Sequence, residues 1–417
     1  MTFTQEENFK IQSIVDLFIS NFNFNMNGKT LETLIFQGGM GVDVSGLKLA
    51  TAVAKTGSAG TISTTLSVNK DDLAQLDPNL LIGINNLVLA IDYEDNYALG
   101  EKSNADFIAS GAGLTKSVFK RAKNQTVHLG EKHYWTIPII SSVSQLPKRL
   151  FNNLGYIILE NTDSGGHNGD GLGFEGTLEE YRNASLDKGI NKIIFAGGVR
   201  TPTDLVKVID HGFDAAQLGT AFLGSIEANY GPEYKAMVIN AGEPGMPDVT
   251  RIPSVSGLAA SGFPIGVIEG VLRGEQFPRY DCADSRTNGC LADCNNIRIS
   301  GEKIGLDPNI IGNYCILRAL RSANEGNRHG YAPLVFSGMH PEKLMLKQWS
   351  RDRKPIPASE IIGRFLIGAF DAIADGSFRT QDYQGKITDD QRAFLVGQFQ
   401  QYQQRENQTL TAKILQV

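Results

Sequence analysis

One histidine of the chain lies in a glycine-rich loop that directly follows an apolar run. The loop reads Gly165-Gly166-His167-Asn168-Gly169, and the run before it, Tyr156 to Leu159, is typical of a buried strand. Glycines let the backbone approach a ligand closely, and an imidazole can accept or donate a proton near neutral pH. Alone, such a turn is more often a plain surface turn. His167 becomes a candidate catalytic residue only if other elements bring a site to it.

Short apolar runs, each followed by a glycine-containing or polar loop, recur through the first half of the chain. Helix-like segments such as Leu178 to Asp187 and Thr203 to His211 separate them. The eight runs are Leu34-Ile35-Phe36, Gly60-Thr61-Ile62, Leu80 to Ile84, Asp106-Phe107-Ile108, Ile137 to Ile140, Tyr156 to Leu159, Lys192 to Phe195 and Ala215 to Leu218. An eightfold alternation of strand and helix predicts a (β/α)₈ TIM barrel, and a doubly wound open sheet is the alternative.

The barrel prediction divides the chain into three parts. Residues 1–240 form the barrel, residues 241–345 form a lid or substrate segment, and residues 346–417 form a C-terminal helical extension. The apolar stripes of the last part, from Ile361 to Ile373, are typical of helices that pack on the barrel or on a second subunit. The sequence therefore leaves a homo-oligomer open.

The seventh and eighth predicted strands end in small residues that suit a phosphate. The seventh runs into Gly197 and Gly198, and the eighth runs into Gly219 and Thr220. Barrels commonly bind a phosphate in these two loops, where backbone N–H groups are the donors and a Cβ would block the approach. Thr220 adds a hydroxyl. We therefore expect a phosphorylated ligand at this rim.

Other strand ends extend the same rim. The first strand leads into Gly38, Gly39 and Met40, where backbone can lie flat against a planar ligand. The third strand leads to Asn85, whose amide offers a donor and an acceptor to a ring edge such as that of a flavin. The fifth strand leads to Ser141, and Gly166 precedes the histidine. One phosphorylated cofactor lying across the rim explains all these positions.

Composition narrows the class of partner. The chain has 417 residues, 41% of them hydrophobic, and a formal net charge of -6, with Lys and Arg scattered along it. This predicts a large buried core and argues against nucleic acid as a partner. Neither a secretory signal nor an apolar run of membrane-spanning length is expected from the sequence. We expect a cytoplasmic protein that acts on a small-molecule substrate, without a membrane partner.

Taken together, these motifs resemble the nitronate monooxygenase family, also called 2-nitropropane dioxygenases. The resemblance runs over about residues 30 to 345 and rests on the order and spacing of seven motifs. They are Gln37-Gly-Gly-Met-Gly41, Gly83-Ile-Asn85, Ser110-Gly-Ala-Gly-Leu114, Pro138-Ile-Ile-Ser-Ser142, Gly165-Gly-His-Asn-Gly169, Ala196-Gly-Gly198 and Gln217-Leu-Gly-Thr220. The FMN-dependent enoyl-acyl-carrier-protein reductases share several of them.

The resemblance implies FMN as cofactor and a role for each motif. The phosphate would be held at Gly197, Gly198, Gly219 and Thr220, and the ring would lie near Gly38, Gly39 and Met40, with Asn85 at its polar edge. His167 would face the substrate, as a general base for a nitroalkane or as an orienting group for a nitronate. The implied reaction is oxidation by O₂ to a carbonyl compound and nitrite.

Two other functions remain alternatives. An enoyl-thioester reductase would use NAD(P)H with the same cofactor loops, and a flavin-binding scaffold would have no turnover of its own. The residues around His167 depart from the usual family pattern, because Asn161 to Ser164 replace a Gly-x-Glu-Ala sequence and the stretch after the histidine is longer and more acidic. These departures surround the site, so they leave the substrate open. His128 and His133 are expected to be ordinary loop histidines.

All four cysteines lie in one segment beyond the predicted barrel: Cys282, Cys290, Cys294 and Cys315. Clustered thiols in an intracellular enzyme suggest a metal or an iron–sulfur cluster more than disulfides. Their spacing fits no standard zinc or ferredoxin pattern. A metal site and plain reduced cysteines both remain open.

Overall fold

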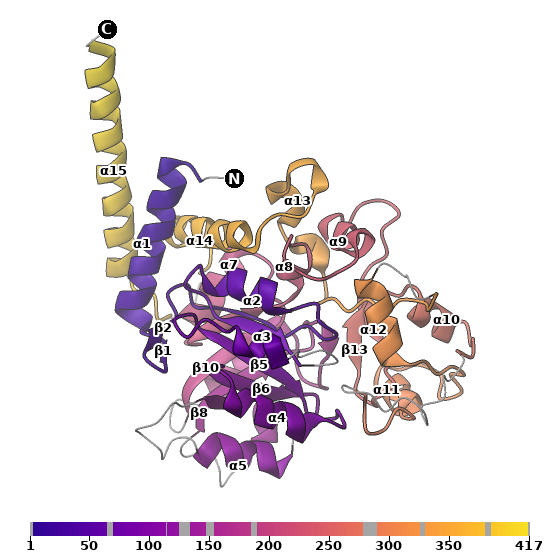
Figure 1. Cartoon of the computed structure of the whole chain (residues 1–417). Coiled ribbons are helices and arrows are strands. Elements are labelled where there is room, and N and C mark those ends of the chain that lie inside the picture. Colours follow the sequence, from indigo (N-terminus) through magenta and orange to yellow (C-terminus); the bar gives the residue numbers. More distant parts are fainter. Residues whose placement is uncertain are drawn as a thin grey trace.

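The computed structural model describes residues 3–64, 70–113, 115–124, 134–146, 154–184, 190–277, 290–325, 330–379 and 385–415. Its centre is an eight-stranded parallel sheet in the order β3-β11-β10-β8-β7-β6-β5-β4 (Figure 1). The strands are β3 (Ile35–Gln37), β4 (Gly60–Ser63), β5 (Ile82–Leu87), β6 (Phe107–Gly111), β7 (Trp135–Ile140), β8 (Leu154–Glu160), β10 (Ile190–Ala196) and β11 (Ala215–Leu218). All eight correspond to predicted runs.

The first and last strands of this order meet, so the sheet closes on itself. A parallel bridge joins Phe36 to Ala59. The Ala59 N–H donates to the Ile35 carbonyl over 3.0 Å, and the Gln37 N–H donates to the Ala59 carbonyl over 2.8 Å. The predicted (β/α)₈ barrel is therefore confirmed, and the open sheet is excluded.

Helices follow the strands around the barrel: α2 (Leu47–Ala54), α3 (Lys70–Ala74), α4 (Tyr93–Lys102), α5 (Lys116–Asn124), α6 (Phe174–Ala184), α7 (Pro202–Asp210) and α8 (Thr220–Leu223). After β7, the described part holds only the 3₁₀ turn η2 (Val143–Gln145). Helix α7 shows most clearly how the local sequence sets where a helix begins and ends. Thr201 and Asp204 form a reciprocal capping box, Pro202 occupies the first turn, and Gly212 follows the end with φ +97°.

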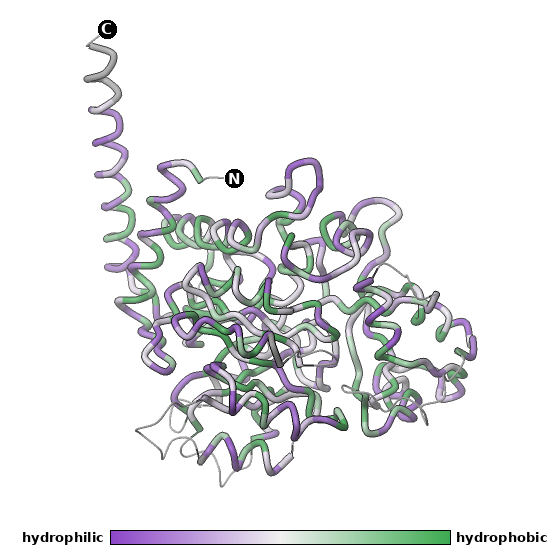
Figure 2. Tube along the Cα trace, viewed as in Figure 1, coloured by the Kyte–Doolittle hydropathy of each residue, from purple (hydrophilic) through white to green (hydrophobic). Residues whose placement is uncertain are grey.

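A hairpin and three long helices lie away from the mouth of the barrel. The hairpin joins β1 (Asn25–Met26) to β2 (Lys29–Thr30), and the Tyr156 hydroxyl donates to the Asn25 carbonyl over 2.8 Å. Helix α14 (Ala358–Asp375) packs between α7 and α1 (Gln5–Phe22). Helix α15 (Asp389–Leu415) runs beside α1 and extends beyond the body, where its tube is mostly hydrophilic (Figures 1 and 2).

The segment after β11 contains α9 (Pro232–Ile239), β12 (Thr250–Ile252), β13 (Ala260–Gly262), α10 (Val267–Leu272), α11 (Ile297–Lys303), α12 (Ile316–Asn324), η4 (Pro341–Lys343), α13 (Leu346–Trp349) and η5 (Arg351–Arg353). Its middle part, residues 250–340, builds a cap with a core of its own, whereas α9 and α13 pack against the barrel core. Ile252, Val267 and Leu334 belong to this second core and are fully buried. The cap reaches the barrel through a small sheet in the order β12-β13-β9, in which β9 (Gly166–His167) comes from the loop after β8. The prediction of unit boundaries at residues 240 and 345 stays a prediction.

Candidate active site

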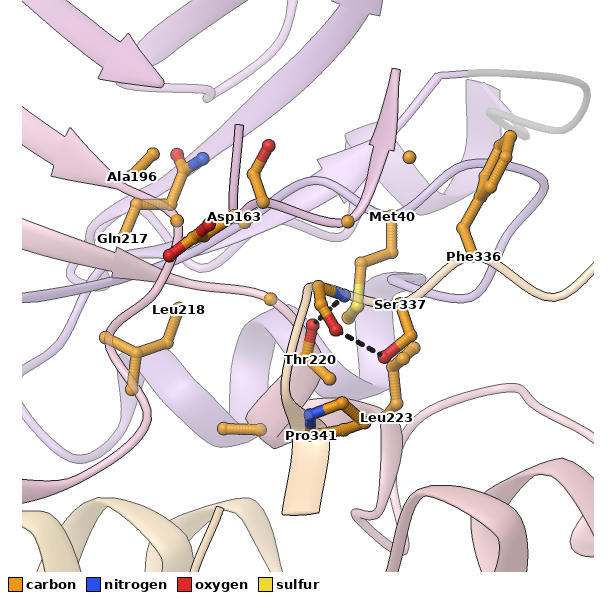
Figure 3. A pocket seen from close by; sticks show the side chains of 18 of the residues that line it. Met40, Asp163, Ala196, Gln217, Leu218, Thr220, Leu223, Phe336, Ser337 and Pro341 are labelled. Atoms are coloured by element: carbon orange, nitrogen blue, oxygen red, sulfur yellow. Dashed lines mark hydrogen bonds between the residues drawn. The ribbon is translucent and has the colours of Figure 1, made fainter. Parts of the chain in front are cut away.

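A cavity lies at the carboxyl ends of the barrel strands, where the barrel faces the cap. It has two adjoining parts of about 1000 and 870 Å³, counting the space that opens to solvent, and their walls share Gly39, Glu160 and Gly166 from the barrel and Leu320 and Phe336 from the cap. One part contains the loops after β3, β10 and β11 (Figure 3). The other contains His167 and Asn85. The structure thus brings together nine of the ten predicted cofactor residues: Gly38, Gly39, Met40, Asn85, Gly166, Gly197, Gly198, Gly219 and Thr220.

The two loops predicted for a phosphate have the backbone that such a site needs. Gly197 and Gly198 have φ values of +95° and +72°, which other residues adopt only at a cost. At Gly219, a Cβ would have no protein atom within 4 Å, so the space beside this glycine is open. Thr220 accepts a hydrogen bond from the Gly338 N–H over 2.8 Å, so its own proton is available to a ligand (Figure 3). A phosphate fits this cradle.

Asn161 holds the loop after β10 in place. Its side chain is fully buried, donates to the Gly197 carbonyl over 2.9 Å and accepts from the Asp163 N–H over 2.9 Å. A Cβ on Gly197 would lie 2.4 Å from the Asn161 amide oxygen. The family pattern has a glycine at this position, so the asparagine is a departure that supports the cofactor loop.

An ion pair fastens the cap to these loops. The Arg200 guanidinium lies 2.7 Å from the Asp163 carboxylate and donates through Nε to the Met339 carbonyl over 2.9 Å. The Met339 N–H in turn donates to the Asp163 carbonyl over 3.0 Å. Three segments that are far apart in sequence therefore meet at one wall of the cavity.

The loop after β3 packs tightly on Asn85. A Cβ at Gly39 would lie 2.1 Å from the Asn85 Cβ, so only glycine fits there.

Ser141, the tenth predicted cofactor residue, is not among the described residues that line the cavity. Its hydroxyl accepts from the Gln145 amide over 2.8 Å, and the backbone of Gly169 and Gly171 packs against it. Ser141 thus supports the loop that carries the histidine.

His167 is held on three sides. It pairs with Ala260 in the small sheet, its ring makes a T-shaped contact with Phe336 at 5.3 Å, and its Nε2 lies 2.7 Å from the Ser254 hydroxyl. Burial lowers the pKa of His167 to about 4. The imidazole is therefore neutral at pH 7. It can donate one hydrogen bond and accept one, but it is a weak base.

Comparison with known proteins places this geometry in a family. The family model described as nitronate monooxygenase matches residues 24–292. The chain belongs to the nitronate monooxygenase family. This family membership confirms the prediction that the protein is an FMN-dependent oxidoreductase. No curated protein matches the chain.

Solved structures share the fold of this nitronate monooxygenase family member at low identity. FabK from Thermotoga maritima is 19% identical, with a TM-score of 0.58 over 82% of this chain and 94% of that one. A nitroalkane oxidase from Streptomyces ansochromogenes is 16% identical, with a TM-score of 0.56 over 81% and 96%. The enoyl reductase domain of MlnA from Bacillus amyloliquefaciens is 13% identical, with a TM-score of 0.55 over 82% and 95%. At these identities the likeness shows the fold alone.

One residue that lines the cavity was not among the predicted site residues. Glu160, at the end of β8, lines both parts of the cavity. Burial raises the pKa of its carboxyl to about 7, with the neighbouring Ser164 hydroxyl opposing part of that shift. In the sequence, Glu160 appears only as the polar end of an apolar run. Its position as the last residue of a strand was the one available signal.

The remaining predicted features of the family member lie elsewhere. Cys282, His128 and His133 lie outside the described residues. Within the described ranges, no group of three His, Cys, Asp or Glu side chains is placed to hold a metal ion. In the same ranges, no helix has both the length and the apolar character needed to cross a membrane.

Proposed function

We propose that this protein binds FMN across the mouth of its barrel and oxidises nitronates with O₂ to a carbonyl compound and nitrite. One observation carries the proposal: the open phosphate cradle and the half-buried, neutral His167 face a single cavity in a chain of the nitronate monooxygenase family. FMN, when bound, would supply the redox chemistry of an oxidation by O₂. The protein supplies binding and placement.

The residues that would hold FMN are the predicted ones. Backbone N–H groups at Gly197, Gly198 and Gly219 and the Thr220 hydroxyl suit the phosphate, because these residues line the cavity with hydrogen-bond donors and the space beside Gly219 is open. Gly38, Gly39 and Met40 would lie along the ring, with the Asn85 amide at its polar edge. Gly166 would lie on the side of the histidine, and Ser141 would act indirectly, by supporting the loop that carries His167.

His167 would orient the substrate. A nitronate is already an anion, so it needs a hydrogen-bond donor and no base. With its pKa lowered to about 4, the imidazole is a poor acceptor for the proton of a nitroalkane at pH 7. The same neutral ring can still donate a hydrogen bond to an anionic oxygen. We therefore expect nitronates to be better substrates than the corresponding nitroalkanes.

Absorption spectra and nitrite release test the proposal. The purified protein should show a flavin spectrum, and under air it should release nitrite from alkyl nitronates. His167→Ala should lower kcat/KM about tenfold or more, because it removes one hydrogen bond to a charged oxygen. An exposed histidine, as in His340→Ala, is the control and should leave the rate unchanged. Absence of nitrite, together with bleaching of the flavin by NAD(P)H and reduction of an enoyl thioester, would instead establish a reductase. Flavin without any turnover would leave only a binding scaffold.

A further inference from the structure

Ser254 connects the cap to the proposed substrate-facing histidine. It lies between β12 and β13, is fully buried, and its hydroxyl approaches His167 Nε2 at 2.7 Å. Sequence separation hides this contact, because Ser254 follows His167 by 87 positions.

The backbone of Ser254 is fixed from a second element. Its N–H donates to the Ser300 hydroxyl over 2.8 Å, and the Ser300 hydroxyl lies 2.7 Å from the Ser254 carbonyl. Ser300 lies in α11 and is fully buried. The carbonyl of the preceding Pro253 also accepts from the Tyr314 hydroxyl over 3.2 Å. Ser254 therefore presents its hydroxyl from a rigid position.

The neighbours of the Ser254 hydroxyl decide where its proton goes. A serine hydroxyl has one proton to donate and two lone pairs that accept. The Ser256 N–H approaches the Ser254 oxygen at 3.4 Å, and the Ser256 hydroxyl lies at 3.2 Å. The Tyr314 hydroxyl, whose proton goes to the Pro253 carbonyl, also interacts with the Ser254 side chain. The Ser256 hydroxyl already accepts from the Leu258 N–H over 3.2 Å, so its own proton can be donated toward Ser254.

The contact with the histidine is the shortest of these. A separation of 2.7 Å is usual when a hydroxyl is the donor, whereas N–H donors favour about 2.9–3.0 Å. The proton of Ser254 is thus directed to Nε2, which accepts it with its lone pair. A neutral imidazole that accepts at Nε2 carries its proton on Nδ1. Among the described residues, Nδ1 has no hydrogen-bond partner of its own.

We propose that Ser254 is a positioning residue that fixes His167 as the Nδ1–H tautomer, so that the ring offers a donor to a ligand in the cavity. Several charged or titratable groups surround this arrangement: Glu160 on the wall of the same cavity, Tyr314 beside Pro253, and Asp170, three residues after His167, with its partners Arg251 and Lys303. Among the described residues, none of these groups hydrogen-bonds to the ring. The tautomer is therefore set by a neutral hydroxyl, where many enzymes use a carboxylate.

The inference rests on the proposed function only for the identity of the ligand, an anion with an oxygen acceptor. Its test is nuclear magnetic resonance of the FMN-loaded protein with ¹⁵N-labelled histidine. The imidazole signals of His167 are identified by their loss in His167→Gln. In the parent protein, Nδ1 should have the shift of a protonated nitrogen and Nε2 that of an acceptor nitrogen.

Variants of the serines separate positioning from general structural support. Ser254→Ala should convert His167 largely to the other tautomer or to a mixture, while Ser254→Thr should retain the parent pattern. Ser300→Ala removes the backbone clamp and keeps the hydroxyl, so the Nδ1–H tautomer should persist. An Nε2–H signal in the parent protein, or an unchanged signal in Ser254→Ala, would overturn the proposal.

Kinetics give a second readout. With nitronate as substrate, Ser254→Ala should raise KM about tenfold, the effect of weakening one hydrogen bond to a charged group, and change kcat less. If no nitronate is turned over, the proposed function fails while the tautomer measurement still decides the role of Ser254. If nitrite is released normally by Ser254→Ala and its tautomer is unchanged, Ser254 is only a packing residue.

Discussion

The guanidinium of Arg200 donates to the carboxylate of Asp163 across 2.7 Å, and this pair joins the loop after β10 to the loop after β8. The same guanidinium donates to the Met339 carbonyl of the cap. The side chains of Arg200 and Asp163 are only 11% and 22% exposed. The pair therefore differs from a surface ion pair, because each partner has lost most of its water.

Replacing Arg200 with alanine should destabilise the protein. Asp163 would keep a mostly buried charge without its partner, and the Met339 carbonyl would lose a donor. We expect the free energy of unfolding in urea to fall by about 2–3 kcal/mol. Arg273→Ala is the matched control, since its pairs with Glu269 and Glu275 are at least half exposed on both sides and should contribute little to stability. Equal changes in the two variants would contradict the assigned role of Arg200.

Alanine at two glycines of the site should have opposite consequences. At Gly219 a methyl group enters open space, so Gly219→Ala should keep the stability of the flavin-free protein and weaken FMN binding at least tenfold. At Gly39 the methyl group meets the Asn85 side chain at 2.1 Å, so Gly39→Ala should lower stability by about 1–3 kcal/mol even without FMN.

Calorimetric titration with FMN and thermal unfolding distinguish these two glycines. Gly397→Ala, inside helix α15 with no atom near the new methyl group, is the control and should preserve FMN affinity while leaving stability unchanged or slightly raised, because alanine favours a helix interior over glycine. Unchanged FMN affinity in Gly219→Ala would argue against a phosphate at this loop.

The pH dependence of stability should report Glu160. Its folded-state pKa of about 7 lies above the ordinary value of 4.5, so between these pH values the folded state binds more protons than the unfolded state. The associated stability is present below pH 4.5 and is lost as the pH rises toward 7. Glu160→Gln should remove this loss, so its stability relative to the parent protein should increase between pH 5 and pH 8. Urea unfolding of both proteins at four pH values measures this difference in stability. If the difference is the same at every pH, the pKa of Glu160 is not raised.

Asn161 should contribute to the stability of the cofactor loop. Asn161→Ala would leave the Gly197 carbonyl and the Asp163 N–H without their partners in a buried region. The expected loss is about 2 kcal/mol in the free energy of unfolding, with weaker FMN binding. Asn79→Ala, at an exposed asparagine that contacts Asp77, should change neither quantity measurably. If FMN affinity stays unchanged while stability falls, Asn161 supports the fold alone.

The barrel was predictable because each strand carries its own local signal. Runs such as Tyr156 to Leu159 are buried on both faces and read as continuous apolar segments. The glycine loops after β10 and β11 were predictable for a similar reason, since a phosphate site needs short-range backbone geometry. The pieces that local pattern cannot show are the two-residue and three-residue strands β9, β12 and β13, which have no periodicity to detect.

The parts of the site that were missed depend on contacts between distant segments. Arg200 meets Met339 and His167 meets Ser254 only after the cap has packed on the barrel. Glu160 was visible as a residue, but its raised pKa is a property of the wall that surrounds it. Sequence separation, rather than unusual residue types, limited the prediction.

His167 is covalently part of the barrel loop after β8, yet its backbone pairs with β13 of the cap. The surroundings of His167 thus come from two parts of the chain: the barrel provides the cofactor loops, and the cap provides the hydroxyl that faces the ring. Substitutions in residues 250–262 can therefore change the surroundings of this histidine without altering any residue of the phosphate cradle.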